Sequence, residues 1–581
     1  MPRGQPVSFM NFRTSPAVVT PLAAQRLPRL ALVLLAALYI LPGLLGREPW
    51  KPYDGANLGL MIHMADGSAN WLYPSIAGLP MSEGGWLPYW IGALFIWALP
   101  FVDPAMASRI PLGLSLAATF VATWYATYHL ARAPGAQPVP FAFGGQASTK
   151  AYACAMADAS LLALIACLGL AHMGHEFSLH PFATAFVAIL FWAFAKVSVI
   201  PTAHNLQATW IVAAGALLGL MASGYPATAT LLIFVTLMGL LQRENAALQV
   251  RSVKQAAIGV FVVAVFLYTL VPWPRDGLVQ WTEVHHHVVR ALKTMVWFGW
   301  PAWPLAAWAI WRWRLQRRSP HIWLPGFWLG VLFVVGVTAG VPQRHLMLTL
   351  PILASLAVFA LPTFKRSALA LIDWVALLLF TTVGFVIWFY WFAFQTGAPA
   401  PAANAVARLL PGFEPAISWI ECAFAAAITV AWAWMIRWRT GHQQHALWKG
   451  LVLSASGTIW VWGLLMSLWL PAVNYGMSYD MVARRIGQVI PASKCISATG
   501  LAPTLFAALE RQGLSIVLNE SLGSDAPQCD HWVMGEDADM PRFNLAAWTP
   551  VTTVWQLDRR GNGIRVFQRL ATPDAAVPSK P

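Results

Sequence analysis

A succession of apolar runs, each about as long as a membrane-spanning helix, constrains this chain more than any other feature. A bilayer core about 30 Å thick needs roughly 20 predominantly apolar residues to cross it as a helix. The composition agrees, since 58% of the 581 residues are hydrophobic and only 10% are charged, unlike a soluble protein. We therefore predict an all-α polytopic membrane protein with about 13 transmembrane helices. The runs cover residues 30–46, 86–102, 109–131, 151–170, 178–198, 206–241, 256–272, 296–311, 322–340, 345–362, 368–395, 416–438 and 447–470.

The run 206–241 is ambiguous, because it is long enough for two spans. Gly224, Tyr225 and Pro226 lie inside it and mark either a kink or a short turn between two helices. Both interpretations stay open at this point. The 32 tryptophans of the chain fit anchoring at the membrane–water interface.

Basic residues predict the orientation of the N-terminus. Arg3, Arg13, Arg26 and Arg29 precede the first span, and no acidic residue accompanies them. Because cytoplasmic segments are enriched in Lys and Arg, we place residues 1–29 in the cytoplasm. The first span has no small-residue cleavage site after it, so we expect it to be retained rather than removed as a signal peptide. The expected location is the inner membrane of a bacterium.

The net charge of +14 raises the question of a nucleic-acid partner. The basic residues cluster at the ends of the apolar runs, where topology and contact with anionic membrane lipids explain them. We therefore expect no nucleic-acid partner. The clearest clusters are Arg312, Arg314, Arg317 and Arg318, and then Arg437 and Arg439.

The composition changes after Leu470, and residues 471–581 alternate charged and apolar positions. Residues 495–519 have the pattern strand, turn, helix, strand, and Gly561 to Gly563 lie between two alternating runs, as in a hairpin. We predict that the transmembrane part covers residues 30–470 and that a small soluble α/β domain follows it. This domain should face the periplasm, which requires an odd number of spans.

Cys495 and Cys529 are the only cysteines of this C-terminal region. We predict a disulfide between them, because the periplasm is oxidising. Closing that loop would contribute roughly 3 to 4 kcal/mol in the chain-entropy model. The alternative is two unpaired thiols packed as small apolar side chains in a cytoplasmic domain.

A polar interlude at residues 47–85 separates the first two apolar runs and is the first predicted periplasmic loop. After Lys51, an apolar stripe of Leu58, Met61, Ile62 and Ala65 indicates a helix lying along the membrane surface. Asp54 stands at the start of that helix. Its carboxylate either caps the helix amides or serves as a base at the membrane boundary.

This interlude resembles the first periplasmic loop of the GT-C membrane glycosyltransferases, in particular the lipid A aminoarabinose transferase and protein mannosyltransferase group. The family's Asp-Glu pair reads Asp54-Gly55 here, and its Lys-Pro-Pro reads Gly84-Gly85-Trp86, while Glu83 remains. The resemblance extends over roughly residues 30–362. It rests on the order of Arg47, Glu48, Pro49, Trp50, Asp54, Gly67 to Trp71, Pro74, Gly78, Pro80, Leu87, Tyr89 and Trp90.

Ionisable residues also interrupt the apolar sequence near residue 175. His172, His175 and Glu176 are spaced so that a helix would place them on one face, which suggests a metal site or a proton relay. The alternative is a polar span end that faces water. By the resemblance, an Asp is expected near His180, and a Lys is expected near Ser223.

The second predicted periplasmic loop covers residues 273–295 and contains three consecutive histidines, His285 to His287. Consecutive residues point in different directions on a helix, so these histidines alone do not predict a zinc site. Arg290 and Lys293 lie on one face and suggest a phosphate-binding pair. The alternative is an interfacial helix with basic side chains that reach towards the headgroups.

Arg344 and His345 stand where the family has Arg-Tyr before a late span. The resemblance implies an inner-membrane enzyme that moves a sugar from a polyprenyl-phosphate carrier to a lipid or other envelope acceptor, such as lipopolysaccharide. Asp54 would then deprotonate or orient the acceptor, while Arg47, Lys51 and Arg344 would stabilise the leaving phosphate. A requirement for a divalent metal stays open. Two alternatives are a catalytically impaired relative that binds a lipid-linked sugar, and a transporter or flippase.

Overall fold

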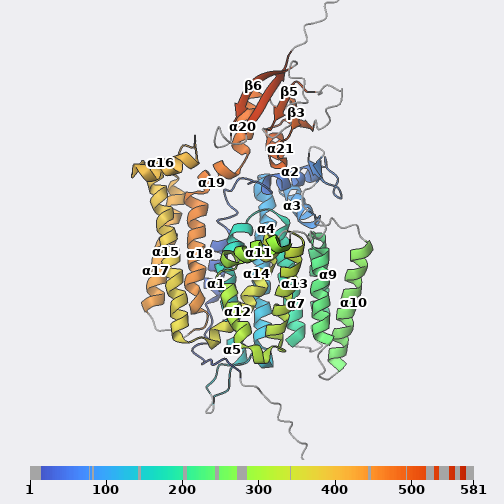
Figure 1. Ribbon diagram of the computed structural model, residues 1–581, viewed down its shortest axis with the longest axis vertical. Helices are drawn as coiled ribbons and strands as arrows, with labels where there is room; N and C mark the ends of the chain where they lie inside the picture. Colours follow the sequence, from blue (N-terminus) through green and yellow to red (C-terminus); the bar gives the residue numbers. More distant parts are fainter. Residues whose placement is uncertain are drawn as a thin grey trace, which may run out of the picture.

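The computed structural model has a helical body with a small mixed sheet at one end (Figure 1). This arrangement confirms the predicted fold class, a polytopic helical membrane protein with a small α/β domain. The described residues are 15–570, apart from 77–78, 81–83, 142–144, 200–205, 242–247, 271–283, 341, 442–445, 492–493, 519–528, 536–547 and 556–562.

Within these residues, 8 helices are long and apolar enough to cross a membrane. They are α4 (Pro104–Ala131), α5 (Thr149–Ala166), α7 (Leu179–Val199), α13 (Pro320–Thr338), α14 (Pro342–Ala357) with its 3-10 extension (Val358–Thr363), α15 (Arg366–Thr396), α17 (Trp419–Gly441) and α18 (Lys449–Leu468). Apolar helices with shorter apolar stretches are α1 (Arg29–Ile40), α3 (Leu87–Ala98), α8 (Leu206–Ala222), α9 (Pro226–Leu241) and α10 (Leu248–Leu270).

Several apolar runs differ from simple spans. Residues 206–241 form two helices, α8 and α9, joined by a turn in which Gly224 has a φ of 90°. The run 86–102 forms α3, whose 12 residues reach only about 18 Å and are too short to cross a bilayer. The helices in the runs 30–46 and 296–311 are equally short, with 12 residues in α1 and 11 in α12 (Ala302–Arg312). The number of spans therefore stays a prediction.

Short helices gather at the end of the body that carries the sheet (Figure 1). The predicted surface helix is α2, which packs between α3 and α21. Part of the predicted loop 273–295 is helical, because α11 begins at Val284. These short helices are α2 (Asp54–Ala65), α6 (Leu168–Met173), α11 (Val284–Phe298), α16 (Ala400–Leu409) and α19 (Leu470–Met477), with a small hairpin of β1 (Ser75–Ile76) and β2 (Leu79–Pro80). Another short helix, α12 (Ala302–Arg312), lies in the half of the body away from the sheet (Figure 1).

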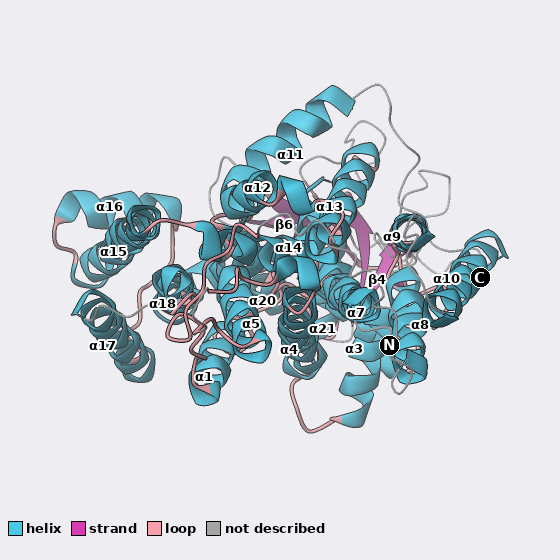
Figure 2. Ribbon diagram, turned by 90° about the horizontal axis from the view of Figure 1, so that it is seen from below, coloured by secondary structure: helices cyan, strands magenta, loops and turns pink. Residues whose placement is uncertain are grey.

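The interior and the rim of the body differ in burial. In α14 and its extension, 94% of the span is buried inside the protein, whereas the figure for α17 is 17%. Figure 2 shows α14 near the middle of the body and α15 and α17 at its edge. Large apolar side chains of α15 and α17, such as Phe385 and Trp434, are exposed there. Such a surface suits contact with lipid.

The sheet domain, which we define as residues 480–569, contains five strands in the order β4-β3-β5-β7-β6. The pairs β3–β4 and β3–β5 are parallel, and β5–β7 and β6–β7 are antiparallel. The predicted strand, helix and strand after residue 495 are present, whereas Gly561 and Asn562 lie outside the described residues. The elements are α20 (Asp480–Val489), β3 (Cys495–Thr499), α21 (Pro503–Arg511), β4 (Ser515–Leu518), β5 (His531–Met534), β6 (Trp548–Val554) and β7 (Ile564–Arg569).

A disulfide joins Cys495, at the start of β3, to Cys529, just before β5, with the two Cα atoms 5.2 Å apart. It therefore bridges two neighbouring parallel strands. Cys154 and Cys167 are buried in the helical body.

The N-terminal segment and the sheet domain lie at opposite ends of the body (Figure 1). Residues 15–28 cross the far end, where the carbonyl of Ala17 accepts a hydrogen bond from Val139 and that of Ala23 accepts one from Leu447.

Candidate functional site

A buried ion pair joins Arg47, in the segment after α1, to Asp54, the first residue of α2. The guanidinium Nη2 lies 2.8 Å from the carboxylate Oδ2, and both side chains are only 2% exposed. Arg47 also donates to the carbonyl of His175 at 2.8 Å and stacks over the ring of Trp50. Because burying either charge alone would be costly, the two residues depend on each other.

Asp54 does not cap its own helix. The N-cap position of α2 is Tyr53, and no side chain bonds to the first turn there. The carboxylate of Asp54 instead accepts from the amides of Trp50, at 3.5 Å, and Phe177. The capping interpretation is therefore wrong, and the carboxylate is buried inside the protein.

Two side chains that the sequence analysis missed hold the segment 46–50 in place. Arg109 of α4, itself only 5% exposed, donates to the carbonyls of Arg47 and Glu48. On the other side, the amide of Asn474 in α19 bonds to the amide of Glu48, the indole of Trp50 and the carbonyl of Gly46. Arg109 could have been identified from the sequence as a charged residue at the start of the apolar run 109–131. Nothing in the local sequence indicates a role for Asn474.

The cluster of His172, His175 and Glu176 does not share one helix face, because α6 ends at Met173. His175 is fully buried, and its Nε2 lies 3.1 Å from the carbonyl oxygen of Tyr39. His172 is exposed, and its ring lies 6.1 Å from that of Trp297. The helix-face prediction is therefore wrong. No three His, Cys, Asp or Glu side chains within the described ranges are grouped so that they would hold a metal ion.

Arg344 contacts the residue that precedes Asp54, because its guanidinium donates at 2.8 Å to the hydroxyl of Tyr53. The ring of its neighbour His345 lies 5.3 Å from that of Tyr225. The Tyr225 hydroxyl in turn lies 2.6 Å from Nδ1 of His180. The start of α14, the start of α7 and the α8–α9 turn therefore meet at one place next to α2.

The resemblance places family lysines in two turns, at residues 84–86 and near Ser223, and the backbones of these two turns touch each other. Gly85 has a φ of 110°, and a Cβ added to it would lie 2.6 Å from the carbonyl carbon of Ser223. The amide of Trp86 donates to the carbonyl of Ala222 at 2.8 Å. The tight approach of these turns leaves no room for a side chain at Gly85.

The remaining predicted residues are more dispersed. Lys51 is partly buried, with its Nζ 5.0 Å from the ring centre of Tyr479, and burial lowers its pKa. Arg290 and Lys293 are exposed on α11. Glu83 lies outside the described residues.

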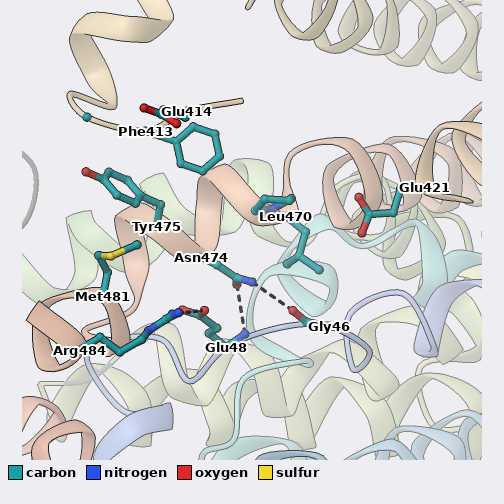
Figure 3. Close-up of a pocket in the computed structure, with 12 residues that line it drawn as sticks. Gly46, Glu48, Phe413, Glu414, Glu421, Leu470, Asn474, Tyr475, Met481 and Arg484 are labelled. Atoms are coloured by element: carbon teal, nitrogen blue, oxygen red, sulfur yellow. Dashed lines mark hydrogen bonds and ion pairs between the residues drawn. The ribbon is translucent and has the colours of Figure 1, made fainter. Parts of the chain in front are cut away.

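A cavity of about 490 Å³ borders the segment 46–48, of which Gly46 and Glu48 line it (Figure 3). None of the predicted site residues lines it. Inside it, Glu48 pairs with Arg484 at 3.2 Å, and Asn474 reaches Gly46. The cavity is lined by Gly46, Glu48, Gly412, Phe413, Glu414, Glu421, Leu470, Pro471, Asn474, Tyr475, Met481 and Arg484.

No protein-family model and no curated protein matches this sequence. Solved structures do. Crystal structures of ArnT from Cupriavidus metallidurans, in the apo state and bound to undecaprenyl phosphate, are each 15% identical to this chain, with a TM-score of 0.58. The match covers 92% of this chain and 97% of ArnT. The Archaeoglobus fulgidus oligosaccharyltransferase matches with a TM-score of 0.40 and 10% identity. The match covers 85% of this chain and 64% of the oligosaccharyltransferase, and no conclusion is drawn from it. At these identities the likeness to ArnT establishes the fold alone.

Proposed function

We propose, starting from the GT-C fold that the likeness to ArnT establishes, that this chain transfers a sugar from a polyprenyl-phosphate carrier to a lipid or other envelope acceptor. The observation that carries the proposal is the buried Arg47–Asp54 pair at the sheet end of the body, with Arg344 bonded to Tyr53, the residue before Asp54. One of the ArnT structures holds undecaprenyl phosphate, a carrier of the proposed class.

In this proposal Asp54 accepts the proton of the acceptor hydroxyl, whose oxygen then attacks the anomeric carbon of the sugar. The bond between that carbon and the phosphate oxygen breaks, and the carrier leaves as its phosphate. The carboxylate of Asp54 pairs with Arg47 and accepts hydrogen bonds from two backbone amides. Contacts of a general base often tighten only once the substrates are bound.

Arg344 is the residue that we assign to the carrier phosphate, because a cation beside the leaving group stabilises the charge that develops there. Its position at the start of α14, against Tyr53, brings a guanidinium next to the residue that precedes Asp54. His345 belongs to the same cluster. Lys51 and the exposed pair of Arg290 and Lys293 are secondary candidates, with Glu83, His172, His175 and Glu176 as proposed substrate contacts.

We assign the sheet end of the body to the periplasm. The opposite end, where residues 15–28 lie, collects basic side chains at the helix ends, as expected for a cytoplasmic face. The side chains concerned are Arg132, Lys150, Arg312, Arg314, Arg317, Arg318, Lys365, Arg437, Arg439 and Lys449.

A second candidate function is binding of a lipid-linked sugar without transfer. It is favoured by the packing of Gly55, where the family has a second acid, because a Cβ at that position would collide with the methyl group of Thr504. The sheet domain therefore occupies the space that a side chain would need.

Mass spectrometry of membrane lipids and lipopolysaccharide, with and without the gene, separates the two functions. A transferase predicts a sugar-sized mass difference that depends on the gene. If no lipid or envelope product changes while the purified protein still binds a polyprenyl-phosphate sugar, then the binding function is correct and the transferase is not.

A further inference from the structure

The sheet domain packs closely against α2, the helix that begins at Asp54. Along one face of α2, Gly55, Gly59 and His63 follow each other at one-turn intervals, and all three meet α21. A Cβ on Gly59 would lie 2.7 Å from the Cβ of Ala507, so the two helix backbones approach closely there. The α2–α21 contact therefore depends on the absence of side chains at the first two positions.

The same domain also holds the chain just before Asp54. The hydroxyl of Thr504, at the start of α21, donates to the carbonyl of Pro52 at 2.6 Å. The amide of Lys51 donates to the carbonyl of Met477 at 2.9 Å, at the end of α19. The contacts of α21 at Pro52 and at Gly55 therefore lie on the two sides of Asp54 in the chain, and α19 holds the chain at Lys51.

His63 contacts α21 near the end of α2 that lies away from Asp54. Its Nε2 lies 2.8 Å from Oε2 of Glu510, the penultimate residue of α21, and the two side chains are 26% and 20% exposed. Its Nδ1 lies 2.7 Å from the hydroxyl of Ser68, which also bonds to the carbonyl of His63 at 3.2 Å. If the Ser68 hydroxyl donates to that carbonyl, then both ring nitrogens donate, as in the charged imidazolium.

The charged groups that act on His63 are both acidic, namely Glu510 on α21 and Asp66 at the end of α2. The hydrogen bond to Glu510 is the main cause that raises the pKa of His63 above its usual value of 6.5, and partial burial opposes it. A raised folded-state pKa means that the stabilisation is fully present below about pH 6.5 and is lost as the pH rises through the raised value.

We propose that the His63–Glu510 pair is an acid-tightened latch, in which protonated His63 holds α21 against α2 and deprotonated His63 loosens that hold. The latch sits at the opposite end of α2 from Asp54, so its state bears on the position of that carboxylate. Its bearing on sugar transfer rests on the function proposed above, whereas the docking contact itself does not.

Hydrogen–deuterium exchange of the full-length protein in lipid nanodiscs tests the latch without any assay of transfer. Exchange in peptides of α2 and α21 would be compared at pH 6 and pH 8, after correction for the intrinsic pH dependence of exchange. We expect about two- to fivefold greater protection at pH 6, the size expected of a partly exposed pair. In His63→Gln and in Glu510→Gln, protection should stay at the pH 8 level throughout.

Lys494→Gln is the matched control, because Lys494 forms an exposed ion pair with Asp530 at 3.9 Å within the same domain. This variant should keep the full pH difference in α2 and α21. Equal protection at the two pH values in the unmodified protein would overturn the latch. A pH difference that survives in both His63→Gln and Glu510→Gln would also overturn it, since another group would then be responsible.

Discussion

Asp54 combines a structural and a proposed chemical role, and the two must be separated at the level of single residues. Its carboxylate is buried against Arg47 and accepts from the amides of Trp50 and Phe177. A buried charge that loses its partner is strongly destabilising, whereas removal of both charges is often tolerated. Loss of activity in a single variant would therefore not identify a base.

We predict that Asp54→Asn lowers the stability by about 3 to 5 kcal/mol, because it leaves the Arg47 guanidinium buried without its counter-charge. The double variant Arg47→Gln with Asp54→Asn should recover most of that loss. Thermal unfolding of the purified protein measures both effects. Transfer, followed by mass spectrometry of the lipid product, should be absent from both variants. Product formed by the double variant would remove Asp54 from the proposed mechanism.

A second prediction at this scale concerns the carrier phosphate. Arg344→Ala should weaken binding of a polyprenyl phosphate by about 1.5 to 3 kcal/mol, the usual worth of a hydrogen bond to a charged group. Binding to purified protein in nanodiscs measures the change. Arg408→Ala, which removes an exposed arginine of α16, is the control and should leave the affinity unchanged. Equal affinities for Arg344→Ala and the unmodified protein would contradict the assignment.

At the scale of helices, α2 is defined by what packs on it rather than by its own pattern. The apolar stripe of Leu58, Met61, Ile62 and Ala65 correctly indicated a helix. It gave no sign that Gly55 and Gly59 would lie against the sheet domain.

Gly59→Ala tests that packing, because its expected effect on stability is opposite to the usual effect of this substitution in a helix. Alanine normally stabilises a helix interior by roughly 0.5 to 1 kcal/mol relative to glycine. At Gly59 we expect the opposite, a lower unfolding temperature, because the added Cβ would lie 2.5 Å from Ile76 and 2.7 Å from Ala507. Gly215→Ala in α8 is the control, since nothing lies within 4 Å of a Cβ there. A rise in unfolding temperature for both variants would show that α2 and α21 do not pack closely.

At the scale of the whole molecule, residues 15–28 and the sheet domain lie at opposite ends of the helical body (Figure 1). The basic end and the end with the sheet domain therefore face different compartments if the body spans a membrane. Orientation follows from the charges, and the disulfide of the sheet domain should follow from the orientation.

We predict that Cys495 and Cys529 are oxidised in intact cells and resist labelling by membrane-permeant thiol reagents until they are reduced. Non-reducing peptide mapping by mass spectrometry measures the crosslink. Cys422, partly exposed on α17, serves as the unpaired reference thiol. Free thiols at both positions that react only with reagents in the cytoplasm would contradict the disulfide and the orientation together.

Hydrophobic patterning and charge were enough to predict a polytopic helical body with a small α/β domain at its C-terminal end. These features are local, because a span or a surface helix is specified by neighbouring residues in the chain. The split of 206–241 into α8 and α9 and the short α3 were harder to predict. Both depend on where the chain turns at the end of the body.

The geometry of the site emerged only from contacts between residues far apart in the sequence. Arg47 meets His175 across 128 residues, and Pro52 meets Thr504 across 452. Such contacts decide that Asp54 is buried rather than exposed and that His175 leaves the face of His172. They also bring Arg109, Asn474 and α21 to the same segment. No local pattern encodes them, because burial depends on which distant elements cover a residue, and that is settled by the packing of the whole chain.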